Sequence, residues 1–197
     1  MTSDANESRP APTDVRRDGA SAPQITVAVI SWNTKELLDR CLTSLEPLHR
    51  AGLADVWVVD NASEDGSAAL VSERHSWVHL IVSEVNLGYG AAVHLVTAAT
   101  SGPWLALANA DIAVRPGALE ALVRAGRDDQ AAGILAPRLV LPDGTTQHSV
   151  WAFPTVGATI MQNVGPHLTP ARLADRLALS GAWNPARARR VPWAEGA

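Results

Sequence analysis

Cysteine is almost absent from this sequence, which has Cys41 and no other thiol among its 197 residues. A single cysteine excludes a disulfide within the chain and a zinc site made of several thiolates. The apolar residues around Cys41 recur at helical spacing. We therefore expect Cys41 to be a small buried side chain on a helix rather than a reactive group.

Long hydrophobic runs and an excess of positive charge are also missing. No apolar stretch reaches the roughly 18 residues that span a bilayer. Charged residues interrupt the N-terminal segment, which therefore does not resemble a signal peptide, and we expect a cytoplasmic protein. The formal net charge is −4, which argues against a nucleic-acid-binding protein, because such proteins usually carry a clear basic excess.

Neither of the two common glycine-rich phosphate-binding motifs occurs. The dinucleotide motif G-x-G-x-x-G would follow the first strand, but residues 31–36 read SWNTKE. The P-loop pattern G-x-x-x-x-G-K-[ST] is absent from the whole chain. The sequence therefore argues against a dinucleotide-dependent enzyme and against a P-loop NTPase. A phosphate group bound by this mildly acidic chain would need a cation or helix N-termini.

Short apolar runs alternate with helical patterns after residues 1–24, a Ser-, Ala- and Pro-rich segment that we expect to be disordered. Such alternation with short connections is typical of a mostly parallel, Rossmann-like α/β sheet with flanking helices, here over residues 25–137. We predict a capping box of Asn33 and Glu36 at the start of the first helix and its end at Pro47. The expected strands are 25–30, 56–59, 78–82, 104–108 and 134–135; the other expected helices are 67–74, 91–100 and 118–124.

Polar side chains stand where these strands end. Parallel strands present their carboxyl ends at one edge of a sheet, where ligands of such folds bind in a crevice. We therefore predict that the polar residues after the strands form one site. Its members are Ser31, Asn33, Asp60, Asn61, Asn86, Asn109 and Asp111.

The segment 105–111 (LALANAD) carries the strongest indication of chemistry. Asn109 and Asp111 are one residue apart, so on an extended chain both side chains would point the same way and could reach one hard divalent cation. The alternative is that Asp111 only caps a turn before Pro116. Asp60 is available to accept hydrogen bonds from a nucleotide base or from ribose hydroxyls.

The pattern changes in residues 138–197. Residues 138–149 predict a hairpin with Asp143 and Gly144 in its turn. Residues 168–179 predict a helix. A small basic patch of Arg187, Arg189 and Arg190 is more typical of a solvated loop than of phosphate contact.

Six segments together resemble the inverting family 2 glycosyltransferases, especially the rhamnosyltransferase-like members. The resemblance implies a fold of the GT-A type and a nucleotide-diphospho-sugar donor, either a UDP-sugar or a dTDP-sugar such as dTDP-rhamnose. It implies a hydroxyl acceptor on a glycan, a lipid-linked saccharide or a small molecule, and with it peripheral contact with the inner face of a membrane. The segments are 27–33 (VAVISWN), 58–67 (VVDNASEDGS), 86–92 (NLGYGAA), 107–111 (LANAD), 142–144 (PDG) and 153–155 (FPT).

The resemblance also implies roles for individual residues. Asp60 would lie near the base and ribose, with Asn86 and Gly88 beside the nucleotide. Asp111 would bind Mg²⁺ or Mn²⁺ in the place of the family's Asp-x-Asp motif, whose first carboxylate is Asn109 here.

Residues 138–197 would form a hairpin and part of the acceptor side. The resemblance also implies that residues 191–197 look like the strand that leads into the acceptor half. In the family that half carries the acidic catalytic base, which is therefore expected beyond Ala197. Glu195, the only carboxylate close to that end, is expected at the surface. Two other functions stay open: a catalytically silent nucleotide-sugar-binding module, and a sugar-phosphate nucleotidyltransferase. The second would need a basic glycine-rich loop after the first strand, which is absent.

Overall fold

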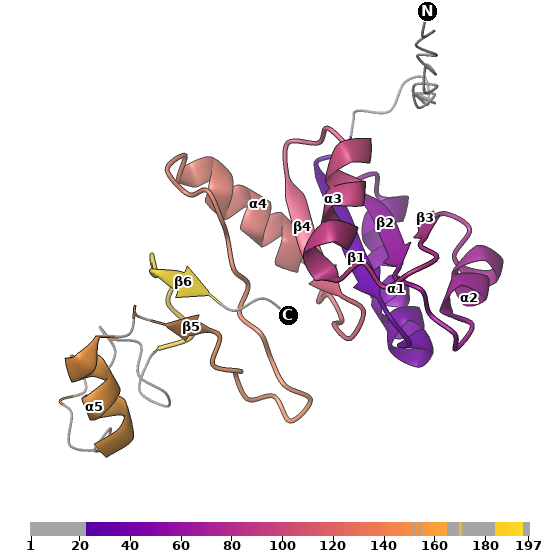
Figure 1. Cartoon of the computed structure of the whole chain (residues 1–197). Coiled ribbons are helices and arrows are strands. Elements are labelled where there is room, and N and C mark those ends of the chain that lie inside the picture. The colour runs from indigo at the N-terminus through magenta and orange to yellow at the C-terminus, as the bar shows by residue number, and fades with distance from the viewer. Residues whose placement is uncertain (1–22, 152, 154, 165–169, 171–183, 195–197) are drawn as a thin grey trace, which may run out of the picture. The chain divides into compact units, whose positions relative to one another are not determined.

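The structure is a computed structural model that describes residues 23–151, 153, 155–164, 170 and 184–194 (Figure 1). The chain divides into two compact units, residues 1–113 and 114–197. This division falls earlier than the boundary at residue 137 that the sequence suggested. The predicted strand at 134–135 is wrong: these residues pair with no described strand, and Ile134 is 92% exposed.

The first unit contains a four-stranded, fully parallel sheet in the order β3-β2-β1-β4. The strands are β1 (Ile25–Ser31), β2 (Ala54–Asp60), β3 (His79–Val82) and β4 (Leu105–Asn109). All four were predicted from the sequence. Ser31 pairs with Asp60 and Ile30 with Asn109, so β1, β2 and β4 end at the same level. We call this side of the sheet the carboxyl edge.

Helices cover both faces of this sheet (Figure 1). They are α1 (Lys35–Arg50), α2 (Ser67–Arg74) and α3 (Tyr89–Ala99). On one face, α3 packs against alternate residues of β1 and β2, because every second side chain of a strand points the same way. This cluster consists of Ala28, Ile30, Val59, Ala92 and Val96.

The helix α1 differs from its prediction at both ends. Its N-cap is Thr34, which makes no side-chain capping bond, so the predicted capping box of Asn33 and Glu36 is wrong. Asn33 has φ +53°, a left-handed conformation that directs its side chain elsewhere. The helix also continues through Pro47, because the next turn buries Leu48 against the core and that burial outweighs the lost backbone bond.

Cys41 lies on the buried side of α1, as the sequence predicted. Burial, and to a smaller extent the negative charge of Asp111, raise the pKa of the Cys41 thiol to about 12. The thiolate is the reactive form of cysteine. Cys41 is therefore an inert packing residue at neutral pH. No described helix has the length and apolar character that crossing a bilayer requires.

The second unit contains α4 (Ala118–Asp128), α5 (Val156–Val164) and an antiparallel pair, β5 (Val150–Trp151) and β6 (Trp193–Ala194). The strand predicted within 191–197 is thus present at β6. The predicted helix at 168–179 lies outside the described residues except for Pro170. The strand partners Trp151 and Trp193 stack with ring centroids 5.9 Å apart.

Two further predictions fall in the second unit. The hairpin is present in short form, with one antiparallel bridge between Val140 and Thr146. The Asp143 carboxylate stabilises its turn by accepting hydrogen bonds from the backbone and hydroxyl of Thr145. In the basic patch, Arg190 donates to both carboxylate oxygens of Asp129, so a structural ion pair already engages this guanidinium.

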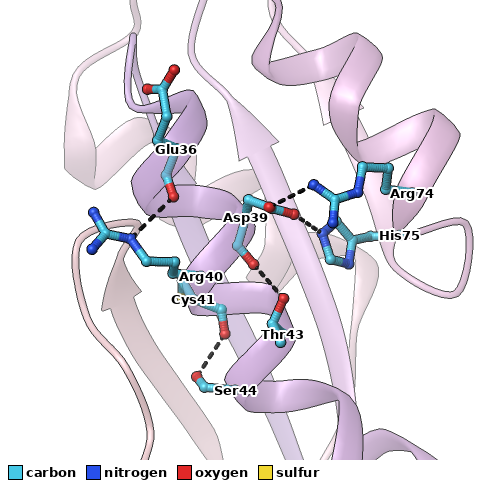
Figure 2. Close-up of polar contacts among 8 residues, drawn as sticks. All are labelled: Glu36, Asp39, Arg40, Cys41, Thr43, Ser44, Arg74 and His75. Carbon is cyan, nitrogen blue, oxygen red and sulfur yellow. Dashed lines mark hydrogen bonds and ion pairs between the residues drawn. The ribbon is translucent and has the colours of Figure 1, made fainter.

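An ion-pair network joins α1 to the end of α2 (Figure 2). Asp39 of α1 accepts hydrogen bonds from Arg74 (2.6 Å) and from His75 Nε2 (2.7 Å). The His75 side chain is only 7% exposed, whereas that of Asp39 is 23% exposed. The hydrogen bond from His75, followed by the positive charge of Arg74, holds the pKa of Asp39 below its ordinary value despite partial burial.

Asp39→Ala should lower the free energy of unfolding by about 1–3 kcal/mol at pH 7, because it leaves the buried His75 ring without this partner. A lowered folded-state pKa stabilises the fold above the unfolded carboxyl pKa of about 3.9, and that stability disappears as the pH falls through the lower folded pKa. Chemical denaturation from pH 3 to pH 7 should therefore show the two proteins converging at the acidic end. A difference independent of pH would contradict the ionic contribution of Asp39.

Candidate functional site

At the carboxyl edge, a backbone hydrogen bond connects the ends of the first two strands. The backbone N–H of Asn61 donates to the carbonyl of Ser31 at 2.8 Å, which ties the residue after β2 to the end of β1. The Ser31 side chain is buried and shares a hydrogen bond of 2.9 Å with the Thr34 hydroxyl. Ser31 therefore shapes the turn between β1 and α1.

Asp60, the last residue of β2, is a buried carboxylate with only 1% of its surface exposed. Its Oδ2 accepts a hydrogen bond from the Ser63 backbone N–H at 3.1 Å. Its Oδ1 is buried and has no hydrogen-bond partner among the described residues. Buried polar atoms are nearly always paired, and leaving one unpaired costs about 1–3 kcal/mol. Asp60 Oδ1 is thus available to a donor group that the described chain does not supply.

Asn33 is already engaged by the loop that follows β2. Its backbone N–H donates to the Ser63 hydroxyl (2.9 Å), and its Oδ1 accepts from the Glu64 backbone N–H (2.8 Å). The left-handed backbone of Asn33 makes both contacts geometrically accessible, and asparagine tolerates this conformation better than most residues. Asn33 therefore holds the β1–α1 loop against the β2–α2 loop.

Asp65 belongs to this site and was not among the predicted residues. Its Oδ2 accepts from the backbone N–H of Lys35, the first residue of α1. Its Oδ1 accepts from the backbone and hydroxyl of Ser67, the first residue of α2. Partial burial raises the pKa of Asp65, but the hydrogen bonds from Ser67 and Lys35 lower it more, and it lies below the ordinary value.

One carboxylate therefore caps two helix N-termini. The cap on α2 could have been recognised from the sequence, because aspartate is common just before a helix. The cap on α1 could not, because Lys35 lies thirty residues away.

Asn61 connects β2 to the loop between β3 and α3. Its Nδ2 donates to Asn86 Oδ1 (2.9 Å), and its Oδ1 accepts from the Leu87 backbone N–H (2.8 Å). Asn86 Oδ1 also accepts from the Gly88 backbone N–H at 2.9 Å. Gly88 has φ +76°, a conformation that favours glycine, and it directly precedes α3. These bonds connect three of the predicted site residues, Asn61, Asn86 and Gly88.

The fourth strand reaches the same edge but is not tied into this network by any hydrogen bond between described residues. β4 ends at Asn109, which is half-buried beside Ile30 of β1. Asp111 lies in the following turn, is exposed, and forms no hydrogen bond or ion pair with a described residue. The extended geometry that would align Asn109 and Asp111 thus stops at Asn109.

The family model described as "Glycosyl transferase family 2" matches residues 26–171, well over half of the chain. The chain belongs to this family. The resemblance that the sequence suggested is confirmed. The parallel sheet with helices on both faces confirms the expected α/β, Rossmann-like fold, and the family match supports the GT-A type.

Two curated relatives of this family 2 chain are similar over part of their length. An N-acetylglucosaminyl-diphospho-decaprenol L-rhamnosyltransferase of Mycobacterium tuberculosis is 29% identical over 143 residues, which cover 67% of this chain and 46% of that protein. The succinoglycan biosynthesis protein ExoO of Rhizobium meliloti is 32% identical over 116 residues, which cover 58% of this chain and 32% of that protein. The chain spans less than half the length of either relative.

Two solved structures are also similar. The mannosyltransferase PcManGT from Pyrobaculum calidifontis, in complex with GDP-Man and Mn²⁺, is 25% identical with a TM-score of 0.48. The alignment covers 60% of this chain and 36% of that one. TarS of S. aureus is 18% identical with a TM-score of 0.46. The alignment covers 53% of this chain and 20% of that one.

The oxygen atoms at and just after the end of β4 in this family 2 chain suit a cation only in part. No group of three or more His, Cys, Asp or Glu side chains that could hold a metal occurs within the described part of the chain. Asp111 and Asn109 offer one carboxylate and one amide oxygen. Mg²⁺ is usually bound through one or two carboxylates together with substrate phosphates. These residues therefore fit a cation that arrives with a diphosphate, not a cage made of protein alone.

Proposed function

We propose that this chain binds the nucleotide-diphospho-sugar donor of a metal-assisted, inverting glycosyltransferase. The observation that carries the proposal is the buried Asp60 carboxylate, whose Oδ1 lacks a partner among the described residues at the edge where α/β sheets bind ligands. A carboxylate oxygen there accepts a hydrogen bond from the ligand. The imide N–H of uracil or thymine and the ribose hydroxyls are donors of this kind.

The diphosphate needs positive charge from another source. Helix N-termini often supply it. At this edge, however, the Asp65 carboxylate already occupies the N-termini of α1 and α2. The N-terminus of α3, which has no side-chain cap, would supply only part of the charge that a diphosphate needs. A divalent cation, Mg²⁺ or Mn²⁺, held by Asp111 with Asn109 would fill this need. When bound, the cation would stabilise the negative charge of the departing nucleoside diphosphate.

Sugar transfer is proposed for the whole protein, since the chain spans less than half of its curated relatives. The acceptor would be a hydroxyl group of a glycan, a lipid-linked saccharide or a small molecule. A base would deprotonate this hydroxyl as it attacks the anomeric carbon from the face opposite the leaving group, which inverts the configuration. None of the described residues is assigned that role. The cytoplasm, at its membrane face for a lipid-linked acceptor, is the expected location.

A nucleotide screen tests the proposal. We expect UDP or dTDP with Mn²⁺ to raise the melting temperature of these 197 residues, while ADP does not. Ligand at about a hundredfold above its Kd stabilises a fold by roughly 2.7 kcal/mol, which raises the melting temperature of a domain this size by several degrees. GDP is a necessary comparison, because guanine also presents a ring N–H. A response to ADP equal to that for UDP and dTDP would reject the pyrimidine assignment.

The transfer assay separates an enzyme from a silent binding module. These 197 residues would be incubated with radiolabelled UDP- and dTDP-sugars, Mn²⁺ and a lipid-linked acceptor extract. The rhamnosyltransferase among the relatives is the reason to include a dTDP-rhamnose donor and a polyprenyl-diphosphate acceptor. We expect binding without transfer. Transfer above that of an Asp111→Ala control would show that these residues suffice for catalysis.

A further inference from the structure

Asn61 stands out at the carboxyl edge because both ends of its side-chain amide are already hydrogen-bonded to the protein, whereas Asp60 Oδ1 has no partner among the described residues. Asn61 is only 3% exposed, whereas its hydrogen-bond partner Asn86 is exposed. Both ends of its amide group face the protein, Oδ1 toward Leu87 and Nδ2 toward Asn86. The sequence predicted Asn61 as a nucleotide contact, and its two side-chain hydrogen bonds point to a supporting task.

We propose that Asn61 is a positioning residue that couples the Asp60 end of β2 to the turn of Asn86, Leu87 and Gly88. The proposal rests on the nucleotide site described above. Three hydrogen bonds join Asn61 to other elements: its backbone N–H to Ser31, and its side chain to Leu87 and to Asn86. It is also the direct neighbour of Asp60.

The turn itself has few other means of holding its shape. Gly88, the N-cap of α3, has no side chain with which to cap the helix, and the cap residue makes no side-chain hydrogen bond. The carboxyl oxygen atoms of Asp65 stabilise α1 and α2 but do not contact α3. Asn86 Oδ1 accepts from both Asn61 and Gly88, so the Asn61 amide orients the group that in turn holds the Gly88 N–H.

Breaking the Asn61–Asn86 bond should therefore disturb the turn even though Asp60 is unchanged. In the proposed site, nucleotide binding depends on Asp60 and on the turn of Asn86, Leu87 and Gly88. Asn61 is next to Asp60 in the chain and is hydrogen-bonded to that turn. Preorganised binding groups lose affinity when the residues that support them are removed. Asn61 thus affects the nucleotide without touching it.

A double-mutant cycle tests this role. Asn61→Ala, Asn86→Ala and the double variant would be compared with the unaltered chain for UDP and dTDP affinity by calorimetry, far below their melting temperatures. We expect each single variant to bind about tenfold more weakly, which corresponds to roughly 1.4 kcal/mol. The double variant should lose clearly less affinity than the two single losses combined, because both changes break the Asn61–Asn86 bond. The proposal would be overturned if the affinity loss of the double variant equalled the product of the two single losses. It would also be overturned if Asn61→Ala bound nucleotide within about twofold of the unaltered chain.

Two controls separate positioning from simple destabilisation. Val71→Ala removes buried apolar atoms from α2, and it should lower the melting temperature without changing nucleotide affinity. Asn61→Asp keeps an acceptor for the Leu87 N–H but places an oxygen against Asn86 Oδ1. It should also weaken binding, and it provides the test if Asn61→Ala does not fold.

Amide hydrogen exchange makes failure of the coupling distinguishable from failure of the proposed function. In Asn61→Ala, the amides of Leu87 and Gly88 should exchange faster, while amides in the β1–β2 pair keep their protection. If the unaltered chain binds no nucleotide, the proposed function is rejected, and exchange still reports on the coupling. Unchanged exchange at Leu87 and Gly88 would reject the coupling by itself.

Discussion

Asp111→Ala should abolish the metal dependence of nucleotide binding and leave the fold intact. The side chain is exposed and makes no hydrogen bond or ion pair with a described residue, so its loss removes no structural contact. Asp65 already neutralises the N-termini of α1 and α2, and the N-terminus of α3 carries only about half a positive charge, so the cation is the proposed counter-charge for most of the diphosphate. In the unaltered chain, we expect Mn²⁺ to tighten binding of a nucleoside diphosphate at least about tenfold, or roughly 1.4 kcal/mol.

Calorimetric titration with UDP, with and without Mn²⁺, measures this effect directly. Glu73→Ala is a matched control, because it removes one exposed negative charge from α2 without touching the carboxyl edge. Asp111→Asn keeps the size of the side chain and removes only its charge, so it should behave like Asp111→Ala. If the Asp111 variants retain both the original affinity and the original response to Mn²⁺, Asp111 is not the metal ligand.

Asp60→Ala should weaken binding of UDP or dTDP by about 1–3 kcal/mol, or about 5- to 150-fold, even in saturating Mn²⁺. The reason is the buried Oδ1, which would accept a hydrogen bond from the base or ribose and would be lost together with the carboxylate. The variant should also discriminate less between UDP and ADP. A loss that is equal for every nucleotide would place Asp60 away from the base.

The control for Asp60 lies on the same strand. Asp55 lies near the start of β2, at the end of the strand opposite to Asp60. Its carboxylate accepts a hydrogen bond from Trp57 Nε1 and contacts His79 of β3. Asp55→Ala removes a carboxylate of equal charge, and it should leave nucleotide affinity unchanged. Since Asp60→Ala also removes the bond from the Ser63 N–H, both variants should be compared well below their melting temperatures.

Local patterns in the sequence were sufficient for the parallel sheet and for most of the polar residues at its edge, although not for Asp65. Apolar runs of strand length and helical repeats each report burial within a few residues, and the alternation of the two leaves few topologies open. That Ser31 and Asp60 lie at one edge of the sheet followed from this topology, and the structure shows that they pair directly. The prediction of a short strand at 134–135 was wrong, because two apolar residues are too short a pattern to distinguish a strand from an exposed loop.

The tertiary structure decided what each polar residue does. Asn33 and Asn61 were both predicted to contact the nucleotide, but their side chains bond to Glu64 and to Asn86 and Leu87 across distant loops. Asp65 caps a helix that begins thirty residues earlier. Spacing along the chain determines which residues arrive at an edge, because strand period and topology are local properties. It does not determine which hydrogen-bond partner each one meets there, because that depends on loops folded from separate parts of the sequence.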